Sequence, residues 1–255
     1  MQKLQKLGNL NHAEYTAGNT RTSRYTKMNE FDLDQSNIRD LNAALHDANT
    51  ATDQSIWKVT NTKGRHAIGV GINAALDLHI DGHVGYYCAG MNQKANVTIN
   101  GHCGSGVAEN MMSGTVTVKG NASQYAGATA HGGLLVIEGD ASSRCGISMK
   151  GVDIVVKGNI GHMSAFMAQT GRLVVCGDAG DALGDSLYEA RLYVRGKVAS
   201  LGADCIEKPM KEEHKTELKK LLEQANITGI NVEEFRRYGS ARTLYNFNID
   251  NVGSY

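Results

Sequence analysis

The chain has 255 residues, of which 41% are hydrophobic and 20% are charged, a composition ordinary for a soluble protein that buries a core. Its 26 basic residues balance its 26 acidic residues, so no overall charge attracts it to nucleic acid or to an anionic membrane. No stretch approaches the roughly 18 consecutive apolar residues of a membrane span, and the first twenty residues lack the apolar core of a secretory signal. We therefore expect neither a nucleic-acid partner nor a membrane partner.

The glycine, proline and cysteine content is unusual. Thirty glycines accompany a single proline, so the glycines do not mark a Pro/Gly-rich disordered segment and are expected at tight backbone positions of an ordered fold. The five cysteines are odd in number and form no CxxC pair. A disulfide framework or a zinc ribbon is therefore not expected, and a reducing, cytoplasmic location is favoured.

Residues 1–55 are expected to form an N-terminal arm with one short helix over 37–47. In the stretch 36–48, Ile38, Leu41 and Leu45 lie at helical spacing behind a Ser/Asn cap. Such a helix has one apolar stripe, which must be buried against another part of the chain.

The central part of the chain repeats every 19 residues. Seven glycines close the repeats, and they are Gly82, Gly101, Gly120, Gly139, Gly158, Gly177 and Gly196. Two residues before each glycine is Ile80, Ile99, Val118, Ile137, Val156, Val175 or Val194. Four residues before it is Leu78, Val97, Val116, Leu135, Ile154, Leu173 or Leu192. The position directly before each glycine is mostly polar, and its residues are Asp81, Asn100, Lys119, Glu138, Lys157, Cys176 and Arg195. This alternation with period two is typical of a short strand with one buried face.

A period near 20 with one strand per unit and no helix predicts a solenoid. We expect an all-β fold, a right-handed parallel β-helix of about seven 19-residue coils within residues 56–208. Small residues shortly after each closing glycine would let successive coils stack about 4.8 Å apart. Residues 57–72 are interpreted as an imperfect earlier coil, because Val59 lies 19 residues before Leu78. A stack of coils needs covers at both ends, and the N-terminal segment and the C-terminal helix with its tail are the expected caps.

Residues 209–255 are expected to form a C-terminal helix and a docking tail. The helix begins near Pro209, and it carries Leu218, Leu221 and Leu222 among alternating charges. The last stretch, 231–255, begins like a short helix and ends in an aromatic segment that we expect to be extended.

The cysteines and histidines do not form an obvious reactive cluster. Cys88 and Cys145 occupy the same position of their repeats, but three coils separate them, or about 14 Å, which is beyond disulfide reach. No four cysteines converge, so neither a zinc site nor an iron–sulfur site is expected. His83 and His102 share a position on adjacent coils, and Asn, Asp and Lys follow at that position. We interpret it as a ladder of turn residues at a solvated corner.

The methionines point to a docking surface. The position ten residues after each closing glycine, which includes Met111 and Met149, is expected to line the interior. Residues on either side of it are expected to point outward, and they include Met91, Met112, His131, Lys150 and Met167. Because Met adapts to irregular surfaces, this sector is predicted to dock a partner. No catalytic, cofactor-binding or metal-binding residue is assigned to the chain, which reads as a rigid scaffold.

The repeats resemble a known family. Over residues 55–206 they closely resemble the GXGXG β-helix domain at the C-terminal end of the glutamate synthase large subunit. The segments that carry this resemblance are 82–92 (GHVGYYCAGMN), 106–120 (GVAENMMSGTVTVKG), 127–133 (GATAHGG), 146–151 (GISMKG), 161–167 (GHMSAFM) and 187–196 (LYEARLYVRG). Position 2, where the large subunit has its amidotransferase Cys, is Gln2 here, and no flavin barrel is present.

Free-standing versions of this domain resemble the β-helix subunit of N-methylglutamate synthase, to which 31–47 and 236–247 are also similar. The resemblance implies a complex that converts glutamate and methylamine into N-methylglutamate and ammonia. It also implies partners, namely a synthase-like subunit with FMN and an iron–sulfur cluster and a class-II glutamine amidotransferase-like subunit. The chain itself is then expected to bind no cofactor and to be a non-catalytic subunit in a hetero-oligomer.

Two related assemblies stay open as alternatives. One is a split glutamate synthase or another glutamine-amidotransfer complex. The other is an assembly like formylmethanofuran dehydrogenase, which has a similar β-helix subunit with glycine-spaced coils and other subunits that hold molybdenum or tungsten. A free-standing β-helix enzyme is disfavoured, because the repeat positions bring no cluster of Asp, Arg or Lys into one groove.

Overall fold

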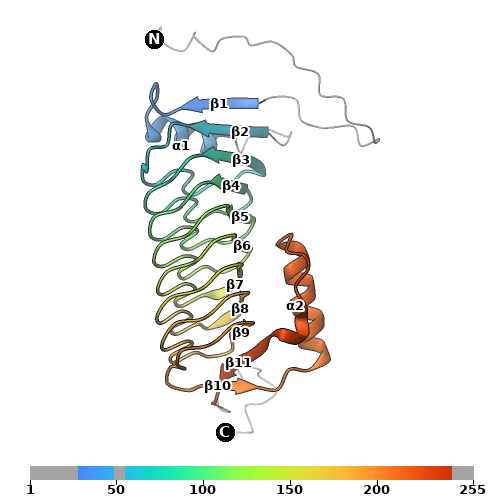
Figure 1. Cartoon of the computed structure of the whole chain (residues 1–255). Helices are drawn as coiled ribbons and strands as arrows, with labels where there is room; N and C mark the ends of the chain where they lie inside the picture. The colour runs from blue at the N-terminus through green and yellow to red at the C-terminus, as the bar shows by residue number, and fades with distance from the viewer. Residues whose placement is uncertain (1–27, 49–54, 243–255) are drawn as a thin grey trace, which may run out of the picture.

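The computed structural model describes residues 28–48 and 55–242 (Figure 1). The described chain winds into a stack of coils, a parallel β-solenoid, and each coil contributes a strand to one sheet along the side of the stack. Eleven strands form this sheet in the order β1-β2-β3-β4-β5-β6-β7-β8-β9-β11-β10. The predicted all-β solenoid of about seven turns is confirmed.

The strands of the regular coils are short. They are β3 (Leu76–Asp81), β4 (Asn96–Asn100), β5 (Thr115–Val118), β6 (Leu134–Ile137), β7 (Lys150–Val156), β8 (Thr170–Val175) and β9 (Arg191–Val194). The flanking elements are β1 (Met28–Asp32), α1 (Ile38–Asp47), β2 (Ser55–Thr60), β10 (Cys205–Lys208), α2 (Glu212–Gln224), a 3₁₀-helix (Val232–Glu234) and β11 (Arg236–Ser240).

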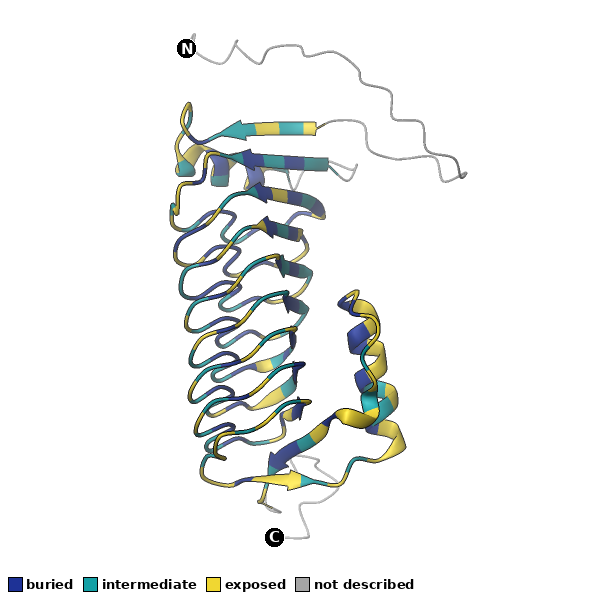
Figure 2. Ribbon diagram, in the orientation of Figure 1, coloured by how far each residue is buried: buried dark blue, intermediate teal, exposed yellow. Residues whose placement is uncertain are grey.

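The coils stack in the predicted 19-residue register. Leu78 pairs with Val97, Val97 with Val116, and the same offset continues to Val175 and Val194. The residues two and four before each closing glycine are all buried, at no more than 1% exposure. Along β3 and β4, buried positions alternate with less buried ones (Figure 2). The core is therefore a set of aliphatic columns that run the length of the stack.

The first predicted coil exists but has a different length. In β2, Trp57 pairs with Leu78 and Val59 pairs with Ile80, so the offset is 21 residues. The expectation that Val59 stacks on Leu78 was therefore wrong by two residues. A shift of two residues keeps the same side chains on the inner face, because strand side chains alternate with period two. Trp57 and Val59 are therefore buried in this register as well, and the two extra residues lie between β2 and β3.

The N-terminal end is covered by α1, as predicted. Asn37 caps this helix by accepting the Asp40 backbone N–H at 2.9 Å, and Leu41 and Leu45 are fully buried against the core. The Asn42 amide also donates to the Ala67 carbonyl oxygen at 2.8 Å, which ties the helix to the first coil. Strand β1, which lies within the predicted arm, was not anticipated and adds a parallel strand to β2.

The C-terminal end is closed by an antiparallel pair. Strand β11 lies between β9 and β10, and Tyr238 of β11 is buried over the last coil. The chain leaves the 19-residue period here, so Ile206, which falls ten residues after Gly196, is 42% exposed instead of lining the interior. The rest of that interior position is buried, including Met111 and Met149.

Helix α2 covers the outer face of the sheet rather than the open end of the stack (Figure 1). Its Leu218, Leu221 and Leu222 are buried on a second apolar cluster, which includes Phe235 and the outward-facing residues of four consecutive strands. Those outward-facing residues are Val136, Val155, Val174 and Tyr193. The equivalent residues of the first regular coils are His79, Thr98 and Thr117, which are not buried, so the helix covers only the apolar half of the outer face.

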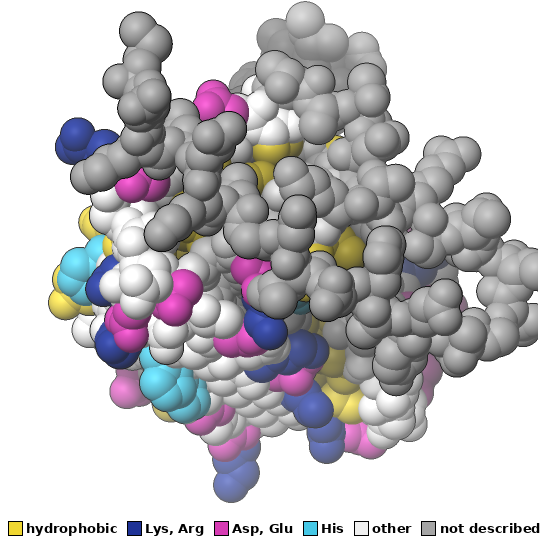
Figure 3. Space-filling view, turned by 90° about the horizontal axis from the view of Figure 1, so that it is seen from above, with side chains coloured by type: hydrophobic (Ala, Val, Ile, Leu, Met, Phe, Trp, Pro, Cys, Tyr) yellow, Lys and Arg dark blue, Asp and Glu magenta, His cyan; other side chains and the backbone are white. Residues whose placement is uncertain are grey.

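The surface carries mixed charge. Figure 3 views the molecule from the N-terminal end of the stack and shows basic, acidic and histidine side chains interspersed. Neither α1 nor α2, the helices in the described ranges, combines the length and the apolar character that a bilayer span requires.

Candidate interaction surface

The residues directly after the closing glycines form a ladder of side chains at one corner of the stack. This confirms that they are turn residues at a solvated corner. In each coil the side chain at this position accepts a hydrogen bond from the backbone N–H of the same position in the next coil. The acceptors are His83, His102, Asn121, Asp140, Asn159 and Asp178, at 2.7–3.0 Å. The rings of His83 and His102 stack with centroids 4.8 Å apart. Because each Nδ1 accepts a backbone N–H, these histidines have a structural role.

The cysteines are all buried and none is disulfide-bonded. Burial raises the pKa of Cys103, Cys145 and Cys205 to about 12, and it raises the pKa of Cys176 to about 11 although Arg195 and Lys157 act in the opposite direction. Cys176 lies on the outer side, as expected, but the C-terminal elements cover it. Protonated, enclosed thiols are poor nucleophiles and poor metal ligands.

Within residues 28–48 and 55–242, no three His, Cys, Asp or Glu side chains lie together in a way that could hold a metal ion. The expectation that this chain carries no catalytic, cofactor-binding or metal-binding residue stays a prediction.

Each of the first six coils contains three residues in the left-handed backbone conformation. They lie five, seven and nine residues after the closing glycine, with φ between 52° and 74°. The residue at position seven is always Ala or Gly, because it turns into the packed interior. The residue at position nine turns outward, so this backbone pattern, which was not predicted from the sequence, determines which side chains reach the surface.

The outward residues nine and eleven positions after the closing glycines form a surface that we call the Met face. Position nine holds Met91, Asn110, Thr129, Ser148, Met167 and Ser186, and position eleven holds Gln93, Met112, His131, Lys150, Gln169 and Tyr188. The three methionines are 41–50% exposed, and His131 and Lys150 are exposed as well. The prediction that these residues point outward is confirmed.

The backbone of the Met face is held between neighbouring coils. The N–H at position nine donates to a carbonyl of the next coil, as Met91 does to Glu109 at 2.8 Å. The N–H at position eleven donates to a carbonyl of the preceding coil, as Met112 does to Asn92 at 2.8 Å. Exposed Met side chains on a backbone bonded in both directions combine an adaptable surface with a rigid base, which suits protein docking.

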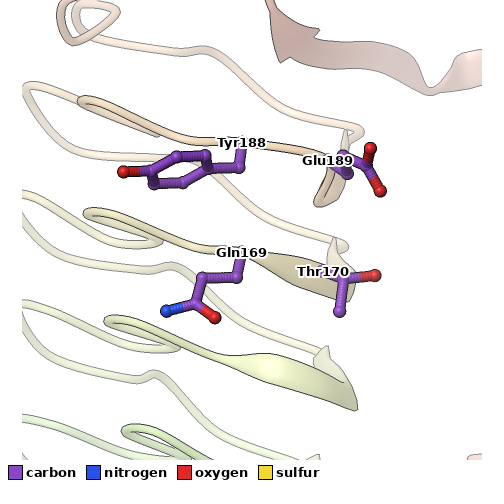
Figure 4. A pocket seen from close by; sticks show the side chains of 4 residues that line it. All are labelled: Gln169, Thr170, Tyr188 and Glu189. Carbon is purple, nitrogen blue, oxygen red and sulfur yellow. The ribbon is translucent and has the colours of Figure 1, made fainter. Parts of the chain in front are cut away.

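The Met face ends in an open pocket of about 370 Å³ near the last coil (Figure 4). Its lining residues come from two adjacent coils, where Gln169 lies beside Tyr188 and Thr170 lies beside Glu189. Gln169 and Tyr188 belong to the Met face itself. The pocket therefore gives this surface a recess lined by polar and aromatic side chains.

A carboxylate holds α2 in place next to this end of the sheet. Glu217 accepts the Tyr193 hydroxyl at 2.5 Å, and Arg191 and Arg172 donate to it at 2.9 and 3.0 Å. Burial acts to raise the pKa of Glu217, but the bonds from Tyr193 and the two arginines outweigh it and leave that pKa lowered. This network was not predicted from the sequence, although the change of the outward strand residues from His and Thr to Val and Tyr indicates that another element covers them.

Comparison with known proteins gives one relationship. The chain is 60% identical over 228 residues to Protein GlxC of Rhizobium meliloti (strain 1021), and the match covers 89% of this chain and 100% of that protein. No protein-family model matches the chain, and no solved structure matches it. The stack of coils fits the C-terminal β-helix family of glutamate synthase, which the sequence resembles. The chain belongs to the same family as GlxC.

Proposed function

We propose that the chain is the non-catalytic β-solenoid subunit of an FMN-dependent, glutamate synthase-like complex, and specifically of N-methylglutamate synthase. The proposal draws its specific partners from the resemblance of the 19-residue coils to the glutamate synthase domain. The structural observation that carries it is the Met face, an exposed surface whose backbone is fixed by hydrogen bonds on both sides. Such a surface suits a subunit that positions other chains.

The proposed mechanism is geometric. Six steps between coils at about 4.8 Å make the regular stack about 29 Å long, and each step is fixed by strand pairing in one register. A stack this uniform can hold an amidotransferase-like chain and a synthase-like chain at a fixed separation. Fixed separation raises the effective concentration of a transferred amine at the second site. FMN and the iron–sulfur cluster, in the partner synthase, would supply the redox chemistry.

The test is purification of the tagged chain from its native host, followed by identification of the attached chains and cofactors. We expect a synthase-like chain with FMN and an amidotransferase-like chain, and an activity that forms N-methylglutamate from glutamate and methylamine. The chain purified alone should contain no flavin. A stoichiometric flavin on the isolated chain would refute the scaffold role.

The same purification separates the alternatives. A complex that forms glutamate but not N-methylglutamate would identify a split glutamate synthase. A molybdenum- or tungsten-containing complex would identify the formylmethanofuran dehydrogenase type.

A further inference from the structure

A basic depression of about 180 Å³ lies beside the Tyr188 pocket, at the C-terminal end of the stack. Tyr188 and Glu189 line both, so the depression continues the Met face around the end of the sheet. Its four cationic residues come from β9, β10, β11 and the segment after β11, and they are Arg191, Lys208, Arg237 and Arg242. Glu189 is the acidic residue of the lining.

The strand register places two of these cations directly opposite each other. Lys208 of β10 pairs with Arg237 of β11. Side chains opposite each other in an antiparallel pair lie close together, and like charges there destabilise the sheet. Elsewhere, neighbouring coils place opposite charges beside each other: Lys119 forms an ion pair with Glu138 and Arg172 with Asp153, both at 2.5 Å. The pairing of Lys208 with Arg237 is therefore unfavourable unless an anion lies between them.

The nearby carboxylates have ion-pair or hydrogen-bond partners other than Lys208 and Arg237. Glu213, whose charge acts on Arg237 at longer range, lies 3.9 Å from Lys211 and 3.6 Å from His214. Glu217 accepts hydrogen bonds from Arg191, Arg172 and Tyr193, and Asp204 forms an ion pair with Arg242. Among the described residues, no carboxylate forms an ion pair with Lys208 or Arg237, Glu189 included.

The guanidinium of Arg237 is held in place for an incoming anion. Its Nε donates to the Pro209 carbonyl oxygen at 3.1 Å, which fixes the plane of the group and leaves its terminal nitrogens as donors. Burial is the largest cause that lowers the pKa of Arg237, and the charge of Arg191 acts in the same direction. Tyr193, Glu213 and Glu217 act in the opposite direction without reversing the shift.

We propose that this depression docks an acidic segment of a partner subunit, with one carboxylate between Lys208 and Arg237 and a neighbouring side chain in the Tyr188 pocket. A protein segment fits better than a free metabolite, because the depression is open and smaller than the roughly 300–1,000 Å³ of typical small-molecule sites. Its continuity with the Met face gives one partner a single contact surface. This inference rests on the proposed function, since it requires a complex.

The first test uses the purified complex and a carbodiimide that joins an amine to a carboxylate without a spacer. We expect a cross-link between the Lys208 side chain and an Asp or Glu of an identified partner chain. The Lys208→Arg variant keeps the charge, so it should keep the complex and lose this cross-link. If Lys208 forms no cross-link to a partner while other lysines do, the proposal is overturned.

The second test measures affinity. Lys208→Gln/Arg237→Gln should raise the dissociation constant of the partner at least ~10-fold and weaken its salt dependence. Lys219→Gln/Lys220→Gln removes the same charge from an exposed part of α2 and should change neither. Equal affinity of both double variants for the partner would overturn the proposal. So would Arg237-dependent binding of the free dicarboxylate glutarate to the isolated chain with a sub-millimolar dissociation constant. If the wild-type chain assembles with no partner, the proposed function itself fails, and that outcome is distinct.

Discussion

The docking of α2 on the sheet can be tested with Leu218→Ala. Leu218 is fully buried against the outward cluster formed by Val155, Val174 and Tyr193. Removing three buried carbons at ~0.8 kcal/mol each costs about 2.4 kcal/mol, and the cavity left behind brings the expected loss to ~3 kcal/mol.

This loss should be local. The coils are stabilised mainly by their neighbours in the stack, so the solenoid is expected to remain folded when the helix is loosened. Hydrogen exchange measures the effect by segment, and ~3 kcal/mol corresponds to ~150-fold faster exchange of the α2 amides. The amides of β3, β4 and β5, which do not touch α2, should exchange at the wild-type rate.

Lys219→Ala is the matched control, because Lys219 is adjacent in the helix and exposed. It should leave exchange unchanged throughout. If Leu218→Ala leaves α2 protected, the helix does not depend on this contact. If β3, β4 and β5 lose protection equally, helix and coils form one cooperative unit and the reasoning from neighbour contacts is refuted.

Three further predictions concern the core, the thiols and the Met face. Val156→Asp should lower the free energy of unfolding by more than ~4 kcal/mol in denaturant titration, because it puts an unpaired charge inside a fully buried column of side chains. The control Lys157→Gln changes an exposed residue and should have little effect on that free energy. Burial raises the pKa of three thiols, Cys103, Cys145 and Cys205, to about 12 from an unperturbed 9.0, so they bind protons more tightly in the folded state. The free energy of unfolding should therefore fall as the pH rises from 9 toward 12. Rapid alkylation of the native protein at pH 8 would contradict this. Met112→Glu should leave the melting temperature and circular dichroism unchanged and should reduce co-purification of partners. Lys220→Glu, a charge change on the exposed side of α2 and outside the Met face, should not reduce it. Normal recovery of the complex with Met112→Glu would exclude the Met face from the interface.

Much of the fold could be predicted because its determinants are local and repeated. The closing glycines, the aliphatic columns and the corner ladder each recur every 19 residues. A wrong assignment of inward and outward residues in one coil would therefore disagree with the other coils. The errors fell where the repetition stops. The first coil holds two extra residues, and the chain after Gly196 turns back as an antiparallel pair, which removes Ile206 from the interior.

The candidate site was predicted in part for the same reason. Met91, Met112 and Met167 could be assigned to the surface from their distance to a closing glycine. The basic depression could not be found in this way, because Arg191, Lys208 and Arg237 lie on three strands whose order along the sheet is not their order in the chain.

The sequence by itself determined the coil, since a strand of alternating apolar residues every 19 positions can bury its inner face only by stacking on copies of itself. Only the tertiary structure decided what covers the outer face and how the stack ends. Helix α2 is amphipathic and could have covered any apolar surface of matching length; the outward column of Val136, Val155, Val174 and Tyr193, with Glu217 bonded to Tyr193, selects the last four coils. Such long-range pairing depends on shape and charge in three dimensions, which a periodic pattern does not encode.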